Sequence, residues 1–151
     1  MKTLTFEQFL PISIETAWEF FSSPNNLERI TPEKMTFKIT SKVPEKAYEG
    51  LLISYRISPF AGLKFNWLTE ITHLKHHQYF IDEQRFGPYK LWHHEHHFTV
   101  VEGGVMMHDI LTYDVGKSIF GWFASKLFVD KQVQEIFDHR YTTLEKIFGK
   151  A

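Results

Sequence analysis

The chain has 151 residues and a mass of 18.0 kDa, which suits a single domain spanning 1–151 with a sizeable buried core. It contains no cysteine, which excludes disulfides, thiol nucleophiles and cysteine-bound metal sites. The 17 basic residues are balanced by 18 acidic ones, so we expect no broad positive surface for nucleic acid. No apolar run is long enough to span a membrane, and the first residues show no signal-peptide pattern. We therefore expect a cytoplasmic protein.

The first quarter of the chain predicts a strand followed by two short helices. Apolar and polar residues alternate over 3–11, which is typical of a strand. Ser13 can cap a helix of two or three turns that ends near Pro24. A second short helix is expected over 27–30, closed by Pro32.

Residues 36–114 predict a meander of antiparallel strands. Short runs rich in aromatic and β-branched residues are separated by glycine, proline and histidine turns. The strands are expected near 36–42, 51–57, 63–73, 78–85, 89–101 and 104–114, the last two joined by a Gly-Gly hairpin turn. With the first strand they form a curved sheet of about seven strands, whose concave face needs a cover.

The last third of the chain supplies that cover. Apolar residues recur at three- and four-residue steps, as in an amphipathic helix, at Ile119, Phe120, Phe123, Leu127, Val133, Phe137, Tyr141, Leu144 and Phe148. We expect a helix over 118–148 with a kink or break at 128–131, so that 132–148 is the main cover. The predicted fold is α+β, with a curved antiparallel sheet wrapped around a long C-terminal helix and two short helices after the first strand.

This order of elements resembles the START-like helix-grip superfamily, also called SRPBCC, which includes polyketide cyclases and plant pollen allergens. Local motifs sharpen the likeness: Gly87-Pro88-Tyr89 precedes Trp92, His94, His96 and Phe98, and Asp109 and Tyr113 follow. Together they look like the signature of a bacterial branch of that superfamily. The resemblance implies a cavity between the sheet and the long helix, which family members use for lipids, polyketides or other hydrophobic compounds. It implies no particular reaction.

The histidine-rich strand is the main lead to a site, because eight of the nine histidines lie between His73 and His108. Side chains alternate along a strand, so His94 and His96 share a face with Trp92 and Phe98, which suggests the concave side. The other face, with His93, Glu95 and His97, is polar throughout and is expected to be solvated. We expect an internal polar cluster made of Gln84, His94, His96 and Asp109.

Three interpretations of this cluster stay open. It is a buried hydrogen-bonded network in which Asp109 fixes a histidine tautomer, a polar handle for a ligand, or a centre of enzymatic or metal chemistry. Acid–base catalysis by His94 or His96 with Asp109 suits a cyclase or dehydratase. A His-x-His pair binds zinc only with a third ligand, either Asp109 or His108. The His108 side chain points to the opposite face of its strand from Asp109. No metal or cofactor is predicted.

The leading hypothesis is binding of a small hydrophobic, lipid- or polyketide-like molecule under the C-terminal helix. The alternatives are a polyketide cyclase, aromatase or dehydratase, and a protein-interaction module related to cell division. The aromatic surplus, 17% of the chain, either lines a pocket or fills it. Neither membrane binding nor a particular oligomeric state is indicated. The expected ligand-binding residues are Trp67, Gln84, Trp92, His94, His96, Phe98, Asp109, Tyr113, Phe137 and Tyr141.

Overall fold

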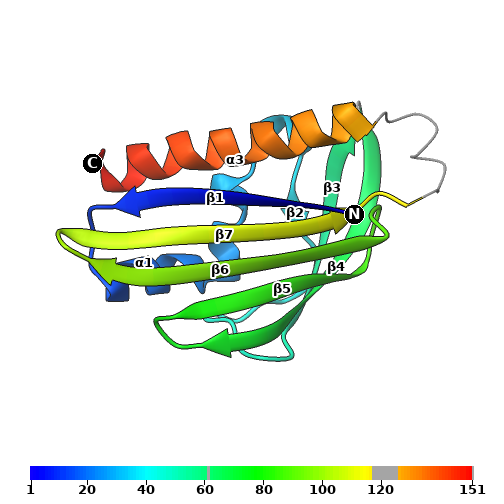
Figure 1. Cartoon of the computed structure of the whole chain (residues 1–151). Coiled ribbons are helices and arrows are strands. Elements are labelled where there is room, and N and C mark those ends of the chain that lie inside the picture. Colours follow the sequence, from blue (N-terminus) through cyan, green and yellow to red (C-terminus); the bar gives the residue numbers. More distant parts are fainter. Residues whose placement is uncertain (61, 117–125, 151) are drawn as a thin grey trace.

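The computed structural model describes residues 1–60, 62–116 and 126–150. Their strands form a seven-stranded antiparallel sheet in the order β1-β7-β6-β5-β4-β3-β2 (Figure 1). The predicted α+β class and the strand count are confirmed. The strands are β1 (Lys2–Leu10), β2 (Lys38–Ile39), β3 (Leu52–Phe60), β4 (Leu63–Lys75), β5 (Tyr79–Phe86), β6 (Leu91–Val101) and β7 (Gly104–Asp114).

The segment after β1 begins with helix α1 (Ile14–Phe21), which the Ser13 hydroxyl caps by accepting a hydrogen bond from the Thr16 N–H. Three short 3-10 helices follow, η1 (Pro24–Asn26), η2 (Glu28–Ile30) and η3 (Glu33–Met35), and η2 lies where the second short helix was predicted. Pro24 and Pro32 lack the N–H groups that an α-helix continuing through them would need, which favours short helices here.

Helix α3 (Lys126–Phe148) runs unbroken through 128–131, so the predicted break is wrong. Val129 and Val133 are both fully buried, and they continue the apolar stripe through the segment that looked interrupted. The expected helical positions over 118–125 lie outside the described residues. Among the described helices, none has the length and apolar character that crossing a membrane requires.

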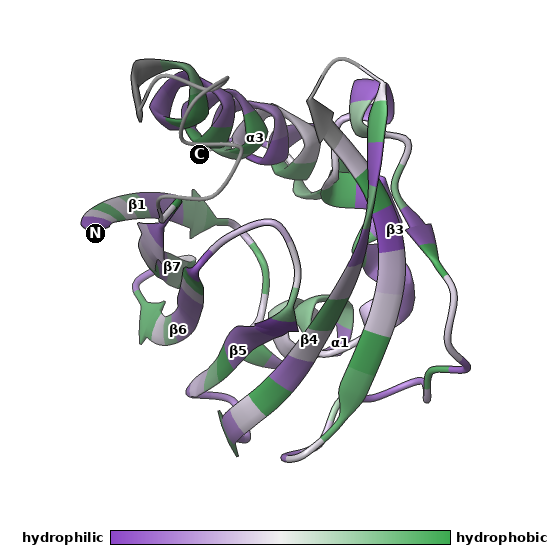
Figure 2. Ribbon diagram, turned by 90° about the vertical axis from the view of Figure 1, so that its right-hand side faces the viewer, coloured by the Kyte–Doolittle hydropathy of each residue, from purple (hydrophilic) through white to green (hydrophobic). Residues whose placement is uncertain are grey.

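The sheet is strongly bent, and α3 lies across its open side (Figure 2). Register shifts between β3 and β4 and between β4 and β5 mark irregularities where strands bend. The rings of Phe6 on β1 and Phe137 on α3 stack with centroids 3.8 Å apart. Lys2 and Asp130 add an ion pair of 2.7 Å between the same two elements. These contacts hold the helix above the concave face.

The β6–β7 hairpin sets the position of the site residues along β7. Val101 pairs with Gly104, which leaves Glu102 and Gly103 in the turn, and Gly103 has a φ of +81° that favours glycine. A Cβ at Gly104 would collide with the main-chain carbonyl of Leu10, so β1 passes close to this end of β7. The resulting register places Asp109 opposite His96.

Candidate functional site

A cavity of about 140 Å³ lies inside the bent sheet, with its lining drawn from the sheet, the 3-10 turns and α3. Most of the lining is apolar, and includes Ile53, Ile57, Trp67, Ile71 and Trp92. An engineered apolar cavity of about 150 Å³ is known to bind benzene. The space is therefore large enough for a single ring, and a longer molecule would need to extend beyond it.

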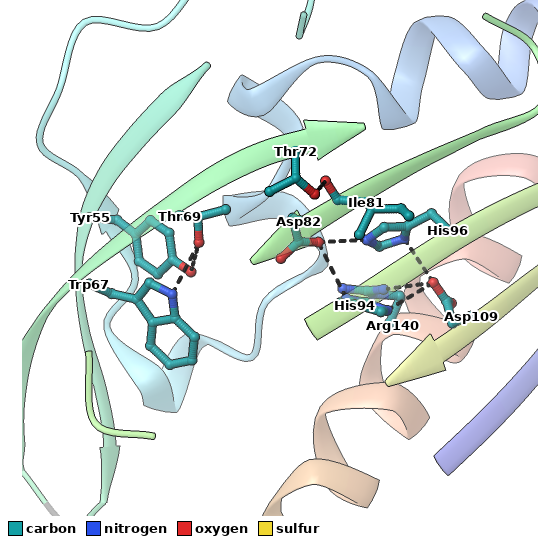
Figure 3. A network of polar contacts seen from close by, with 10 residues as sticks. All are labelled: Tyr55, Trp67, Thr69, Thr72, Ile81, Asp82, His94, His96, Asp109 and Arg140. Atoms are coloured by element: carbon teal, nitrogen blue, oxygen red, sulfur yellow. Dashed lines mark hydrogen bonds and ion pairs between the residues drawn. The ribbon is translucent and has the colours of Figure 1, made fainter. Parts of the chain in front are cut away.

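One part of the cavity lining is polar, and it belongs to a cluster of five residues from four elements, of which all but Asp109 line the cavity. His94 and His96 lie two positions apart on β6, so they share the concave face. In the strand pairing, Asp82 of β5 lies opposite His94 and Asp109 of β7 lies opposite His96. Arg140 of α3 completes the group, which we call the His–Asp cluster (Figure 3).

Two carboxylates lie on opposite sides of the two imidazoles (Figure 3). Oδ2 of Asp82 is 2.9 Å from Nε2 of His96 and 3.6 Å from Nδ1 of His94. Oδ1 of Asp109 is 3.1 Å from Nε2 of His94 and 2.8 Å from Nδ1 of His96. The last contact falls outside hydrogen-bond geometry, so it is a close charge contact. Arg140 Nη1 lies 3.6 Å from the same Asp109 oxygen.

The cluster is almost dry, because the side chains of His94, His96 and Asp109 are 4%, 7% and 2% exposed. Burial opposes ionisation of Asp109, but His96, His94 and Arg140 outweigh it and hold the Asp109 pKa well below its usual value. The Asp82 pKa is lowered in the same way. Both carboxylates are therefore ionised at neutral pH.

The two histidines differ in their affinity for a proton. Burial and the neighbouring His96 lower the pKa of His94, although Asp109 and Asp82 partly oppose that. For His96, burial is outweighed by the two carboxylates, and the pKa is raised. His96 is therefore the more basic of the pair and His94 the one that more readily stays neutral. Such a pair can hold and release a proton inside a cavity.

A second polar feature of the cavity lining is the hydroxyl of Thr69. It accepts a hydrogen bond of 3.0 Å from the indole N–H of Trp67 and lies 3.1 Å from the Tyr55 hydroxyl (Figure 3). All three residues line the cavity. Burial is the largest cause of the raised Tyr55 pKa, so this phenol stays protonated.

The predicted site residues separate into two groups, and their role in binding stays a prediction. Trp67, Trp92, His94 and His96 line the cavity. Asp109 joins the His–Asp cluster and also lines a second hollow of about 290 Å³ with Phe137 and Tyr141. Phe98 packs in the core near Trp18, and the hydroxyl of buried Tyr113 donates to Asp130.

The expected presence of Gln84 in the internal cluster is wrong. Its side-chain amide instead donates to the main-chain carbonyl of Tyr89, 2.6 Å away, and accepts from the Tyr89 N–H at 3.2 Å. Gln84 therefore ties together the β5–β6 connection. The position that we assigned to Gln84 is taken by Asp82, two residues earlier on the same strand.

Asp82 and Arg140 are the cluster members that sequence reasoning missed. Asp82 has the same strand parity as Gln84, so alternation alone could not choose between them. Arg140 was recognisable by spacing, because it lies three residues after Phe137 and four before Leu144 on the buried stripe of α3. A charge on such a stripe indicates a buried partner, which here is Asp109.

No protein-family model matches the chain, and no curated protein matches it significantly. Solved structures do match over nearly the full length. A Chromobacterium violaceum protein aligns with a TM-score of 0.75 at 12% identity, covering 100% of both chains. A Thermus thermophilus protein aligns with a TM-score of 0.71 at 22% identity, covering 96% of this chain and 95% of its own.

A START superfamily protein from Mycobacterium smegmatis also aligns, with a TM-score of 0.70 at 13% identity, covering 97% of this chain and 96% of its own. At these identities the likeness concerns the fold alone. The chain therefore has the START-like helix-grip fold.

Proposed function

We propose that this protein binds a small hydrophobic molecule in the cavity beneath α3, with the His–Asp cluster orienting a polar group of that molecule. The observation that carries the proposal is the mixed lining of the cavity, which is apolar over most of its surface and ends on buried, ionised residues. Ligand sites commonly combine an apolar lining with a few convergent polar groups. A cytoplasmic location is part of the same proposal.

The size of the cavity favours a ligand whose buried part is one ring bearing a hydroxyl or carbonyl group. A lipid- or polyketide-like molecule fits this description when its polar ring is held inside and its remainder extends outward. A hydroxyl would donate to Asp82, and a carbonyl would accept from His96 or Arg140. The fit of the ligand to the apolar lining and its hydrogen bonds to the His–Asp cluster can be tested separately.

Binding is tested with single-ring phenols and a hydrophobic fluorophore, using the full chain and native mass spectrometry of freshly purified protein to find a retained molecule. Ile53→Phe should weaken saturable binding, because Ile53 is 2% exposed and lines the cavity. Leu52→Phe is the matched control, since Leu52 precedes it on β3 and is 50% exposed. The proposal fails if no probe saturates, or if both variants affect binding equally.

A second function, acid–base catalysis on such a ligand, is favoured by the unequal basicity of His94 and His96. In this proposal the neutral imidazole of His94 accepts a proton from a hydroxyl or an acidic carbon of the bound molecule, and Asp109 stabilises the resulting imidazolium. His94→Gln should then abolish turnover while the ligand still binds. Equal loss of binding and turnover would leave only the first proposal, binding of a small hydrophobic molecule.

A further inference from the structure

The His–Asp cluster brings three donor atoms of different residues together at one point of the cavity lining. Oδ2 of Asp82, Nδ1 of His94 and Nε2 of His96 lie within 4.8 Å of one another. For bonds of about 2.1 Å to a shared metal ion, neighbouring ligand atoms are roughly 3.0–3.5 Å apart. The two distances from the Asp82 oxygen, 2.9 and 3.6 Å, bracket that spacing. The three residues could therefore hold one metal ion.

The opposite nitrogen of each imidazole faces Asp109. Nε2 of His94 is 3.1 Å and Nδ1 of His96 is 2.8 Å from Oδ1 of Asp109. A carboxylate behind a metal-bound histidine fixes the tautomer and leaves the lone pair of the other nitrogen on the metal side. Asp109 occupies that position for His94, to which it is hydrogen-bonded, so the His94 lone pair would be directed toward Asp82. Its contact with Nδ1 of His96 falls outside hydrogen-bond geometry and is a close charge contact.

Charge balance favours a cation at the same point. With both imidazoles neutral, Asp82 and Asp109 contribute −2 and Arg140 contributes +1, so the cluster carries −1. The nitrogen lone pairs of His94 and His96 would then face the Asp82 carboxylate at 3.6 and 2.9 Å. At these distances a proton or a metal ion is needed between the nitrogen and the oxygen. All three donor residues also line the cavity, so further coordination positions would face the bound molecule.

We propose that Asp82, His94 and His96 bind one divalent transition-metal ion, with Asp109 as the positioning residue for the His94 imidazole. Two histidines and one carboxylate with open positions suit Zn²⁺ or Fe²⁺, whereas Mg²⁺ prefers oxygen ligands. The third ligand is then Asp82. From the sequence, we considered Asp109 and His108 for this position. An open position would polarise a carbonyl or hydroxyl oxygen of the ligand. The metal site does not depend on which hydrophobic molecule binds.

The experiment titrates chelator-stripped full-length protein with Zn²⁺, with Fe²⁺ under anaerobic conditions and with Mg²⁺, by calorimetry and thermal unfolding. We expect one equivalent of Zn²⁺ or Fe²⁺, a rise in Tm and no response to Mg²⁺. Asp82→Asn should lower the affinity at least tenfold as a lost ligand, and Asp109→Asn by roughly 10–100-fold as a lost positioning residue. Co²⁺ bound to the unaltered protein should show visible d–d absorption of a nitrogen and oxygen ligand set.

The matched control is the double variant His93→Gln/His97→Gln on the outer face of β6. These histidines also contact carboxylates, His93 with Glu83 at 2.7 Å and His97 with Glu95 at 2.9 Å, but they lie outside the cavity lining. The proposal is overturned if this control loses the metal as Asp82→Asn does, if Asp82→Asn binds normally, or if neither Zn²⁺ nor Fe²⁺ binds the unaltered protein.

Circular dichroism shows whether each variant folds, and the Co²⁺ spectrum tests the site without any substitution. Absence of that absorption at a saturating Co²⁺ concentration also overturns the proposal. Phenol binding by the chelator-stripped protein is measured in parallel, so that failure of the metal site and failure of the hydrophobic ligand site give different results.

Discussion

One oxygen of Asp109 lies within 3.1 Å of both His94 and His96, although the two histidines point different ring nitrogens at it. The arrangement follows from the sheet, because two residues of β6 share a face and the β7 register sets Asp109 opposite the second of them. The buried carboxylate therefore orients the His94 ring by a hydrogen bond and lies in close contact with the His96 ring. Its loss should affect folding stability as well as any ligand or metal.

Asp109→Asn should destabilise the metal-free protein by about 3 kcal/mol, because it removes the buried carboxylate that is hydrogen-bonded to His94 and that faces Arg140. Urea unfolding measures this change. Asp138→Asn on the exposed face of α3 is the control, and its effect should stay within about 0.5 kcal/mol. Equal effects of the two substitutions would contradict a stabilising role of the cluster.

The folding stability of the protein should fall in acid because Asp109 becomes protonated. The Asp109 pKa is lower in the folded protein than in the unfolded chain, where an aspartate has a pKa of about 3.9. Its stabilisation is therefore complete above the unfolded value and is lost as pH falls toward the folded value, since the unfolded state binds the extra proton. The stability difference between the unaltered protein and Asp109→Asn should therefore narrow progressively as the pH falls below about 5. A constant difference would contradict the low pKa of Asp109 in the folded protein.

The fold was predictable because strand alternation and helical periodicity report burial directly. His94 and His96 at 4% and 5% exposure confirm the predicted inner face of β6, and the outer His93 is more exposed. The extent of 36–42 was not predictable, because pairing across β2 and β3 continues for only two residues. The choice between Asp82 and Gln84 depended on a loop contact to Tyr89 that no local pattern shows.

The long helix illustrates the same limit. The stripe through Val133 and Phe137 was visible in the sequence, whereas the burial of Val129 and the ion pair of Asp130 with Lys2 depend on where β1 lies. Asp130 beside Val129 looked like part of an interruption because one of its partners, Lys2, is 128 residues away in the chain.

Thr69→Val should cost about 1–3 kcal/mol, because it keeps the shape of the side chain but leaves the indole N–H of Trp67 without its acceptor. The Tyr55 hydroxyl would also lose its neighbour at 3.1 Å. Thr3→Val is the control on the exposed face, where Thr3 contacts Thr112. Chemical denaturation of both variants checks the prediction, and a cost at Thr69 as small as that at Thr3 would show that the contact contributes little.

Phe137 separates a structural role from a ligand-binding one. Its ring stacks on Phe6, lies 5.0 Å below the Arg140 guanidinium and is 5% exposed, so Phe137→Ala should cost about 3–5 kcal/mol. Tyr141→Ala, at 46% exposure on the same helix, should cost far less. The milder Phe137→Leu should leave phenol affinity within about twofold, because Phe137 lines the second hollow and not the cavity beneath α3. A different result, in which Phe137→Leu abolishes phenol binding while stability is kept, would place the ligand in the second hollow. Phe137 and Tyr141, which are among the ligand-binding residues predicted from the sequence, both line that hollow.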